Sequence, residues 1–410
     1  MVKDYARTAK KITAVLFLVQ SLSSAGFISV FTVNALVGAE LSGRPALAGL
    51  PETVRVLGQA IAALAWGYTM ERIGRRRGFT LGQMVGVVGS GVAGGAVIAR
   101  SFPVFLVGLL LMGIARASAD LGRFAAAEVH LPAERGRAIS NVVLGGTVGS
   151  VVGPLLAGVM GRWSLHAGFP ELAGAYGVGF LVWGAAAILV FTWLRPDPRD
   201  VGRELAQLHP HTVPHLARTR ALPEILRQPG VIVAIVTVVF AQLVMVMLMV
   251  MTSVHMKGEQ HPLTAISLVI SVHAFGMHAF SIISGRMTDR WGRAPVIILG
   301  SGILILSCLM AAPSAGLLPL LIALFLLGLG WNFAYVAGST LLADQLSPTE
   351  RAKTQGFNDL LLGFAAAAGS LGSGFVFAVG GYGTLGVVAA SAALVPLGLA
   401  VWWQRRVRRD

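Results

Sequence analysis

Long apolar stretches follow one another along almost the whole chain, and they constrain its fold more than any other feature. A helix of roughly 20 apolar residues crosses a bilayer core about 30 Å thick. Twelve stretches of suitable length lie between Ile12 and Trp403. With a mean hydropathy of +0.75 and 12% charged residues, the chain is too apolar for a water-soluble domain. We therefore predict an all-α membrane protein with twelve transmembrane helices.

The predicted spans form two sets of six. Residues 1–194 are expected to form an N-terminal six-helix bundle, 195–229 a cytoplasmic linker, and 230–410 a C-terminal six-helix bundle. The spans are expected at residues 12–37, 46–70, 78–99, 102–129, 137–160 and 171–194, and then at 230–254, 263–287, 294–312, 315–345, 351–379 and 382–404.

The formal net charge of +14 would favour nucleic-acid binding in a soluble protein, but the basic residues are distributed as in a membrane protein. Most lie at the two ends of the chain and in alternate loops. An excess of Lys and Arg in alternate loops marks the cytoplasmic side. We therefore expect both termini in the cytoplasm, a bacterial inner-membrane location, a lipid bilayer as the partner and no nucleic acid. The exceptions are Arg44, Arg100, Arg162 and Lys257 in the opposite loops, and Arg55, Arg116 and Arg123 within spans.

The two halves of the sequence repeat each other. One group of residues recurs 218 positions later and a second group recurs 216 positions later, which indicates duplication. Repeated halves in a membrane protein are typical of alternating access, in which two bundles rock about a site near the midplane. The first group is Gly67, Glu71, Gly74 and Arg75, which recurs as Gly285, Asp289, Gly292 and Arg293; the second is Glu128, Pro132, Glu134 and Arg135, which recurs as Asp344, Pro348, Glu350 and Arg351.

Two motifs in the sequence resemble those of the major facilitator superfamily. The segment 67–75 resembles the GxxxDRxGRR loop motif, with Glu71 where Asp is usual, and Gly149, Gly153 and Pro154 resemble the GxxxGP helix-packing motif. The resemblance implies two six-helix bundles with 6+6 pseudo-symmetry and a transporter, not an enzyme.

The loop motif also predicts a gate. Ion pairs among Glu71, Arg72 and Arg75, at a cytoplasmic helix end, would hold one gate shut and break when it opens; the alternative is that these charges only set topology. The second copy of the gate motif contains Gly285, Asp289, Arg290, Gly292 and Arg293.

A candidate copper site lies in spans 7 and 8. Residues four apart share one helix face, so Met245 pairs with Met249, and His273 pairs with Met277. Both pairs are expected at one depth in the membrane. Thioether and imidazole ligands favour Cu(I) over harder cations, whereas the alternative for methionines is simple packing. Secondary metal candidates are Met247, Met251, His255 and Met256.

The MxxxM and HxxxM pairs resemble those of the CcoA-like bacterial copper importers. That resemblance implies copper uptake from periplasm to cytoplasm, for the assembly of haem-copper oxidases. Copper would be the transported substrate, with no prosthetic group, and a cytoplasmic copper acceptor is an expected partner. One polypeptide is expected to suffice, as a monomer.

The charged pair in span 4 leads to a rival hypothesis. Arg116 and Asp120 are four residues apart and are expected to pair, either to neutralise each other or to couple protons to transport. The alternative function is a proton-coupled drug or metabolite exporter, because the GxxxGP motif is common among antiporters. Span 1 lacks the acidic residue that such coupling would use.

Overall fold

The computed structural model describes residues 2–131, 134–208 and 220–407, so residues 209–219 of the expected linker lie outside the described residues. Within these ranges the chain forms α-helices and one short 3-10 helix, and no strand. In chain order the elements are α1 (Val2–Ser42), η1 (Pro45–Leu47), α2 (Leu50–Ile73), α3 (Arg75–Ile98), α4 (Phe102–Asp120), α5 (Gly122–Glu128), α6 (Arg135–His166), α7 (Ala173–Trp193), α8 (Pro198–Leu208), α9 (Leu222–Leu226), α10 (Pro229–Gly258), α11 (Leu263–His278), α12 (Ser281–Trp291), α13 (Arg293–Ala311), α14 (Leu317–Asp344) and α15 (Pro348–Val407).

The helices account for the twelve predicted spans. Ten helical segments are long and apolar enough to cross a membrane. The last of them contains two spans, because α15 bends at Gly381, whose φ of +69° is a conformation that favours glycine. The remaining span is α2, whose 24 residues extend about 36 Å. The predicted all-α architecture is therefore confirmed.

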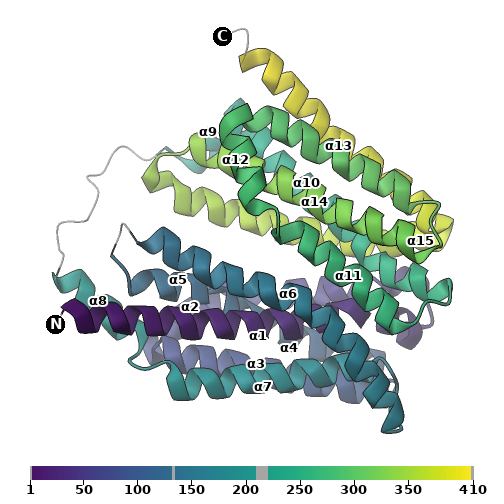
Figure 1. Ribbon diagram of the computed structural model, residues 1–410, viewed down its shortest axis with the longest axis horizontal. Helices are drawn as coiled ribbons and strands as arrows, with labels where there is room; N and C mark the ends of the chain where they lie inside the picture. Colours follow the sequence, from purple (N-terminus) through teal and green to yellow (C-terminus); the bar gives the residue numbers. More distant parts are fainter. Residues whose placement is uncertain (1, 132–133, 209–219, 408–410) are drawn as a thin grey trace. The chain divides into compact units, whose positions relative to one another are not determined.

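The chain divides into two compact units, Met1–Val37 with Val54–Pro214, and Gly38–Thr53 with His215–Asp410. In the first unit, α3 packs against α4 and α7, and α6 packs against α5 and α7 (Figure 1). Its core contains large buried aromatic side chains, including Phe105 and Tyr176, whose rings meet edge to face at 5.7 Å.

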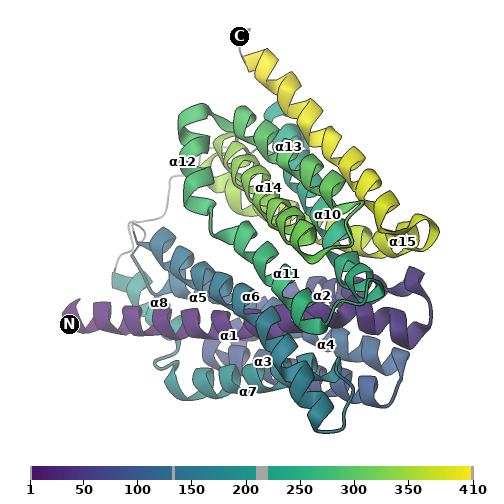
Figure 2. The same cartoon turned by 45° about the vertical axis from the view of Figure 1, so that its right-hand side comes forward.

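In the second unit, α14 packs against α10, α11 and α13, and α15 packs against α10 and α13 (Figure 2). The segment 38–53 also belongs to this unit. Its 3-10 helix packs on α15, where the Ser370 hydroxyl donates to the Gly49 carbonyl oxygen at 2.8 Å.

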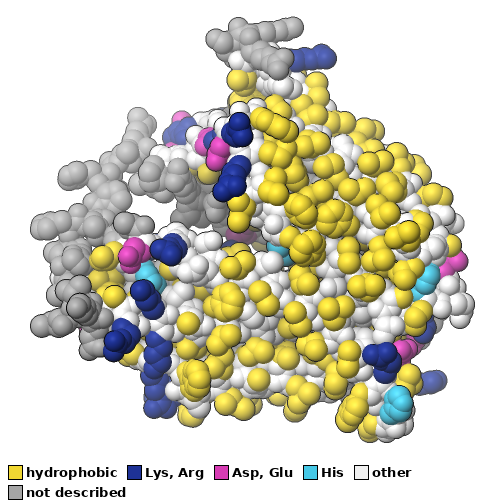
Figure 3. All heavy atoms as spheres, viewed as in Figure 1, with side chains coloured by type: hydrophobic (Ala, Val, Ile, Leu, Met, Phe, Trp, Pro, Cys, Tyr) yellow, Lys and Arg dark blue, Asp and Glu magenta, His cyan; other side chains and the backbone are white. Residues whose placement is uncertain are grey.

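Each unit has a surface suited to lipid. Hydrophobic side chains cover the flanks of the helices, and Lys and Arg gather near helix ends (Figure 3). Large apolar side chains are exposed on α2, α7 and α14, among them Ile61, Ile188 and Leu318. Such surfaces are stable where hydrocarbon takes the place of water. We call the end of each unit where the linker joins its helices the linker end.

Candidate functional site

The interior of the first unit contains a chain of charged and polar side chains. The Arg116 Nε atom pairs with Asp120 Oδ1 at 3.1 Å, so the ion pair predicted from their spacing is confirmed. The Gln59 amide donates to Asp120 Oδ2 at 2.8 Å, and Arg55 donates to Gln59 Oε1 at 2.8 Å. Two helices, α2 and α4, therefore supply a connected polar cluster.

An aromatic ring from α1 completes this cluster. The guanidinium carbons of Arg55 and Arg116 lie 4.5 Å and 5.0 Å from the centroid of the Phe27 ring. Arg116 also donates to the Ser24 hydroxyl at 3.2 Å. Cation–π contacts of this kind strengthen when water is excluded. We call Ser24, Phe27, Arg55, Gln59, Arg116 and Asp120 the arginine cluster.

The arginine cluster lies near the middle of a membrane span. Arg116 follows Phe102 by 14 residues and precedes Glu128 by 12 along the continuous span of α4 and α5. At about 1.5 Å per residue, either end is roughly 20 Å away. The cluster contains two guanidinium groups and one carboxylate. Ionisable groups at this depth are costly and usually functional.

Two amide groups elsewhere in the first unit also have spare hydrogen-bonding capacity. Tyr176 donates to Asn34 Oδ1 at 3.0 Å, and Ser23 donates to Gln83 Oε1 at 2.9 Å. The Nδ2 group of Asn34 and the Nε2 group of Gln83 are buried and have no partner within the described residues. Buried unpaired donors are uncommon in native proteins.

The second unit contains the residues of the predicted copper site. Met245 and Met249 are buried on α10. His273 is fully buried on α11, and its side chain is directed to α14, where Nδ1 donates to the Leu324 carbonyl oxygen at 2.9 Å. The Nε2 atom of His273 has no partner within the described residues. Met277 is half-buried one turn later. One imidazole nitrogen is therefore already used for packing against α14.

The secondary metal candidates lie in varied surroundings. Met247 faces Gly369 of α15, while Met251 and Met256 are fully buried. The His255 ring stacks on Tyr382 at 4.3 Å, and its Nε2 donates to the Ser314 carbonyl oxygen. Across the described part of the chain, no three His, Cys, Asp or Glu side chains form a metal-binding group.

Neutral polar side chains, which the sequence analysis missed, also occupy the second unit. The Trp331 indole donates to Gln242 Oε1 at 3.0 Å. Asn332 donates to the Met277 carbonyl oxygen at 2.7 Å and accepts from Ser284 at 2.7 Å. These contacts join α10, α11, α12 and α14 without a formal charge.

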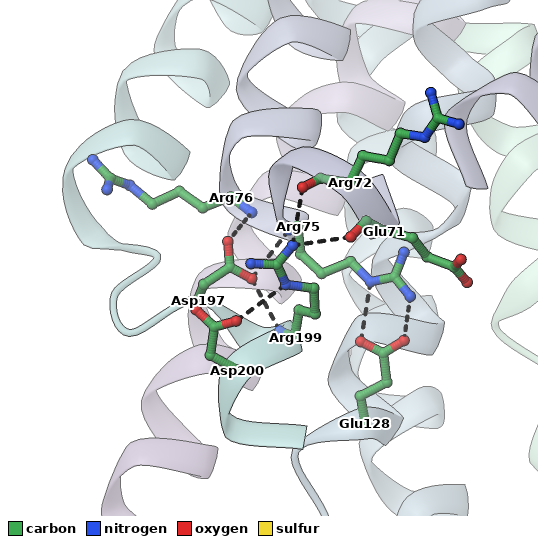
Figure 4. Close-up of polar contacts among 8 residues, drawn as sticks. All are labelled: Glu71, Arg72, Arg75, Arg76, Glu128, Asp197, Arg199 and Asp200. Carbon is green, nitrogen blue, oxygen red and sulfur yellow. Dashed lines mark hydrogen bonds and ion pairs between the residues drawn. The ribbon is translucent and has the colours of Figure 1, made fainter. Parts of the chain in front are cut away.

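At the linker end of the first unit, the gate motif pairs differently from the expectation. Arg75 forms a two-pronged ion pair with Glu128, and its Nε lies 3.1 Å from Glu128 Oε2 (Figure 4). The side chains of Glu71 and Arg72 are exposed, and their carbonyl oxygens accept hydrogen bonds from Arg199. Arg75 therefore pairs with a residue 53 positions away and not with Glu71.

The second copy of the gate motif repeats this arrangement. Arg293 Nε pairs with Asp344 Oδ2 at 2.7 Å, and Asp289 Oδ1 lies 4.0 Å from Arg293 Nη1. Gly74 and Gly292 have φ angles of +93° and +88°, which explains why glycine recurs between helices at both positions. Gly67 and Gly285 have open space around them, and Arg290 is exposed.

The glycines of the GxxxGP motif bring two helices together. A Cβ atom on Gly149 would lie 2.0 Å from the Ser21 carbonyl oxygen, and one on Gly153 would lie 2.4 Å from that of Ala25. Pro154 lies inside α6. The motif therefore packs α6 closely on α1, as small residues do in membrane helices.

Comparisons with known proteins agree with this architecture. The model of the Major Facilitator Superfamily matches residues 16–258 and 235–410. The chain is 36% identical to the uncharacterized MFS-type transporter YdeG of Bacillus subtilis, over 97% of this chain and 93% of the relative. It is 30% identical to the riboflavin transporter RfnT of Brucella anthropi, over 96% of each.

Solved structures show the same fold. A bacterial homologue of the lysosomal transporter Spinster superposes with a TM-score of 0.70 at 17% identity, over 96% of this chain and 94% of that one.

Proposed function

Because this chain belongs to the Major Facilitator Superfamily, we propose that it is a secondary transporter of an organic solute, which the arginine cluster binds through an anionic or carbonyl group. Alternating exposure of a midplane site is the mode of action of such repeated bundles. The linker end would face the cytoplasm in a bacterial inner membrane, as the distribution of Lys and Arg indicates.

The observation that carries this proposal is the pair of guanidinium groups, from Arg55 and Arg116, that the arginine cluster holds against the Phe27 ring inside the first unit. Arg116 pairs with Asp120, and Arg55 is linked to the same carboxylate through Gln59. Guanidinium groups bind carboxylate, phosphate and planar acceptors through paired donors. The Phe27 ring adds an aromatic surface between α1 and the two arginines.

The relatives support an organic solute. RfnT is named as a riboflavin transporter. Riboflavin is a flat aromatic heterocycle with carbonyl acceptors. A solute of that class would stack on an aromatic ring and accept hydrogen bonds from arginine and amide donors. The amide nitrogens of Asn34 and Gln83, which have no partner within the described ranges, are further donors in the same unit.

Asp120 is the residue best placed to couple protons to this transport. It accepts from both Gln59 and Arg116, so its protonation would release Arg116 for a solute anion. A solute anion would in turn compete with Asp120 for the same guanidinium. The proton on Asp120 and the solute on Arg116 would thus be bound at the same time. This arrangement favours symport of the solute with a proton.

Copper import is the second candidate, and one observation favours it. The buried Nε2 of His273 has no hydrogen-bond partner among the described residues, and Met245, Met249 and Met277 supply thioethers on α10 and α11. Soft neutral ligands of this type suit Cu(I). The cargo would then be copper for haem-copper oxidase assembly, passed to a cytoplasmic acceptor.

Ligand-dependent thermal unfolding of the purified protein separates the two candidates. We expect riboflavin-like heterocycles or organic anions to raise the unfolding midpoint of the wild type, and Arg116→Gln to abolish that shift. Arg162→Gln, which removes an exposed arginine, is the matched control. A shift produced by Cu(I) alone, and lost in His273→Ala or Met277→Ala, would replace the organic solute with copper; radioactive copper uptake by cells would then confirm it.

A further inference from the structure

A basic cavity lies at the linker end of the first unit, apart from the arginine cluster. Its volume is about 420 Å³, and it is formed where the junction of α2 and α3 meets the segment between α7 and α8 and the first turn of α8. The cavity contains four arginines and two aspartates. Its lining consists of Ile73, Arg76, Arg77, Arg195, Pro196, Asp197, Arg199 and Asp200.

Both aspartates are already engaged within the protein (Figure 4). Asp197 Oδ1 accepts from the backbone N–H groups of Arg75 and Arg199, and its Oδ2 accepts from that of Arg76, each at 3.0 Å. Asp200 pairs with Arg199 at 3.1 Å. The four arginines therefore leave the cavity with a formal charge of +2.

The arginines differ in how they are held. Arg76 donates twice to the Phe191 carbonyl oxygen, at 3.0 Å and 2.6 Å, and its guanidinium lies 4.9 Å from the Phe191 ring. Arg77 and Arg195 are exposed, and neither side chain forms an ion pair with any described residue. Arg76 is thus fixed against α7, while Arg77 and Arg195 keep donors for a ligand.

An apolar surface adjoins the cavity. On α7, which ends beside it, Ile188, Phe191 and Trp193 are 66%, 57% and 58% exposed. Tryptophan at the end of a transmembrane helix is typical of the level of lipid headgroups. A ligand in the cavity would therefore have polar contacts on one side and hydrocarbon on the other.

We propose that this cavity binds the phosphate group of a membrane lipid whose headgroup carries a net negative charge, such as phosphatidylglycerol. Basic pockets between transmembrane helices bind anionic headgroups. Arginine suits phosphate oxygens because its donors form a planar fork. The acyl chains would lie along α7. Asp197 caps the start of α3 next to Arg75, which belongs to the gate pair. A lipid in the cavity would therefore lie against the segment that carries the gate pair.

Native mass spectrometry of delipidated protein tests the proposal. The probes are phosphatidylglycerol and phosphatidylcholine with identical acyl chains. We expect preferential retention of phosphatidylglycerol, weakened by about tenfold or more in Arg77→Gln/Arg195→Gln, because each arginine near an anionic lipid contributes to binding. Arg77→Gln alone should give a smaller loss.

The matched control is Arg137→Gln/Arg405→Gln, which removes two exposed arginines outside the cavity. It should retain phosphatidylglycerol as the wild type does. Equal losses in the two double variants would overturn the proposal, because they would indicate attraction by overall charge. In a second arm, inorganic phosphate is added at constant ionic strength. If phosphate stabilised the folded protein and the protein showed no preference between the two lipids, the lipid assignment would be overturned. The ligand would then be a free anion.

Discussion

The two units of this transporter are alike at their linker ends and different in their interiors. Arg75 pairs with Glu128 in the first unit as Arg293 pairs with Asp344 in the second. Inside, the first unit contains the charged arginine cluster, whereas the second contains neutral contacts such as that between Trp331 and Gln242.

This difference shows which residues both halves of a duplicated sequence retain. The linker-end pairs join the start of one helix to the end of another, a task that both units share, so their residues recur at nearly constant offsets. An interior charge is costly in lipid and is retained where it serves a task. Recognition of a charged or polar solute is therefore expected to depend on the first unit much more than on the second.

The largest expected effect is on transport by variants of the arginine cluster. Arg116→Gln should lower solute uptake into proteoliposomes by at least about tenfold, since a charged hydrogen bond contributes roughly 1.5–3 kcal/mol. Asp120→Asn should reduce the dependence of uptake on a proton gradient. His273→Gln in the second unit should retain uptake within about twofold, because that side chain's Nδ1 serves packing on α14.

If His273→Gln abolished uptake and Arg116→Gln did not, solute recognition would depend on the second unit and not on the first. Equal amounts of each variant in the membrane, measured by immunoblot, are required for that conclusion. Arg116→Lys sharpens it further, because lysine keeps the charge and loses the planar fork, so partial uptake is expected.

Close helix packing should be sensitive in both units. A Cβ atom on Gly149 would lie 2.0 Å from the Ser21 carbonyl oxygen, and one on Gly328 would lie 2.3 Å from that of His273. Gly149→Val and Gly328→Val are each expected to destabilise the protein by about 1–3 kcal/mol through overpacking. Gly302→Val is the control, since nothing lies within 4 Å of that position. Thermal unfolding in detergent measures all three, and an equal loss for Gly302→Val would contradict the packing argument.

Contacts between residues close together in the sequence were predictable, whereas contacts between residues far apart in the sequence were not. The spans follow from apolar length alone, and the Arg116–Asp120 pair follows from its spacing of four on one helix. The repeat singled out Glu128 and Asp344 but did not reveal that they pair with Arg75 and Arg293, because those partners are brought together by tertiary packing.

The remainder of the arginine cluster was not predictable in the same way. Phe27, Arg55 and Gln59 come from α1 and α2, and only packing brings them to α4. The spacing of four between Arg55 and Gln59 was a usable signal, because an arginine inside a span requires a partner on its own face. The copper ligands remain a prediction, since their spacing gives helix faces but not the direction in which His273 points.

The linker-end pairs should contribute similarly to stability. Arg75→Gln and Arg293→Gln each remove one partner of a partly exposed ion pair, for which a loss of about 1 kcal/mol or less is expected. Arg75→Gln should have the larger effect, because its pair is less exposed, at 15% and 31% against 28% and 43%. Thermal unfolding at low and high salt measures the two losses. Absence of any salt dependence would show that these residues act by packing instead of charge.

The smallest expected effect separates two glutamates that the repeat makes equivalent. Glu350 accepts from the Arg220 side chain at 2.7 Å through both oxygens and from the Ser347 N–H at 3.0 Å. The Arg220 guanidinium therefore holds the pKa of the Glu350 carboxyl well below its usual range. Glu134, its counterpart, is exposed and makes no capping hydrogen bond.

The contacts of Glu350 predict that its contribution to stability depends on pH. A carboxyl whose pKa is lowered by folding stabilises the protein fully above its unfolded pKa, near 4.5, and loses that contribution as pH falls toward its folded pKa. The unfolding midpoint of the wild type should therefore exceed that of Glu350→Gln by a constant margin near neutral pH, and the margin should shrink below pH 4.5. Glu134→Gln, at an exposed position without a capping hydrogen bond, is the matched control. If the margin for Glu350→Gln were unchanged on acidification, the stabilising interaction would not be the ion pair with Arg220, and the apparent difference between the two glutamates would be one of packing.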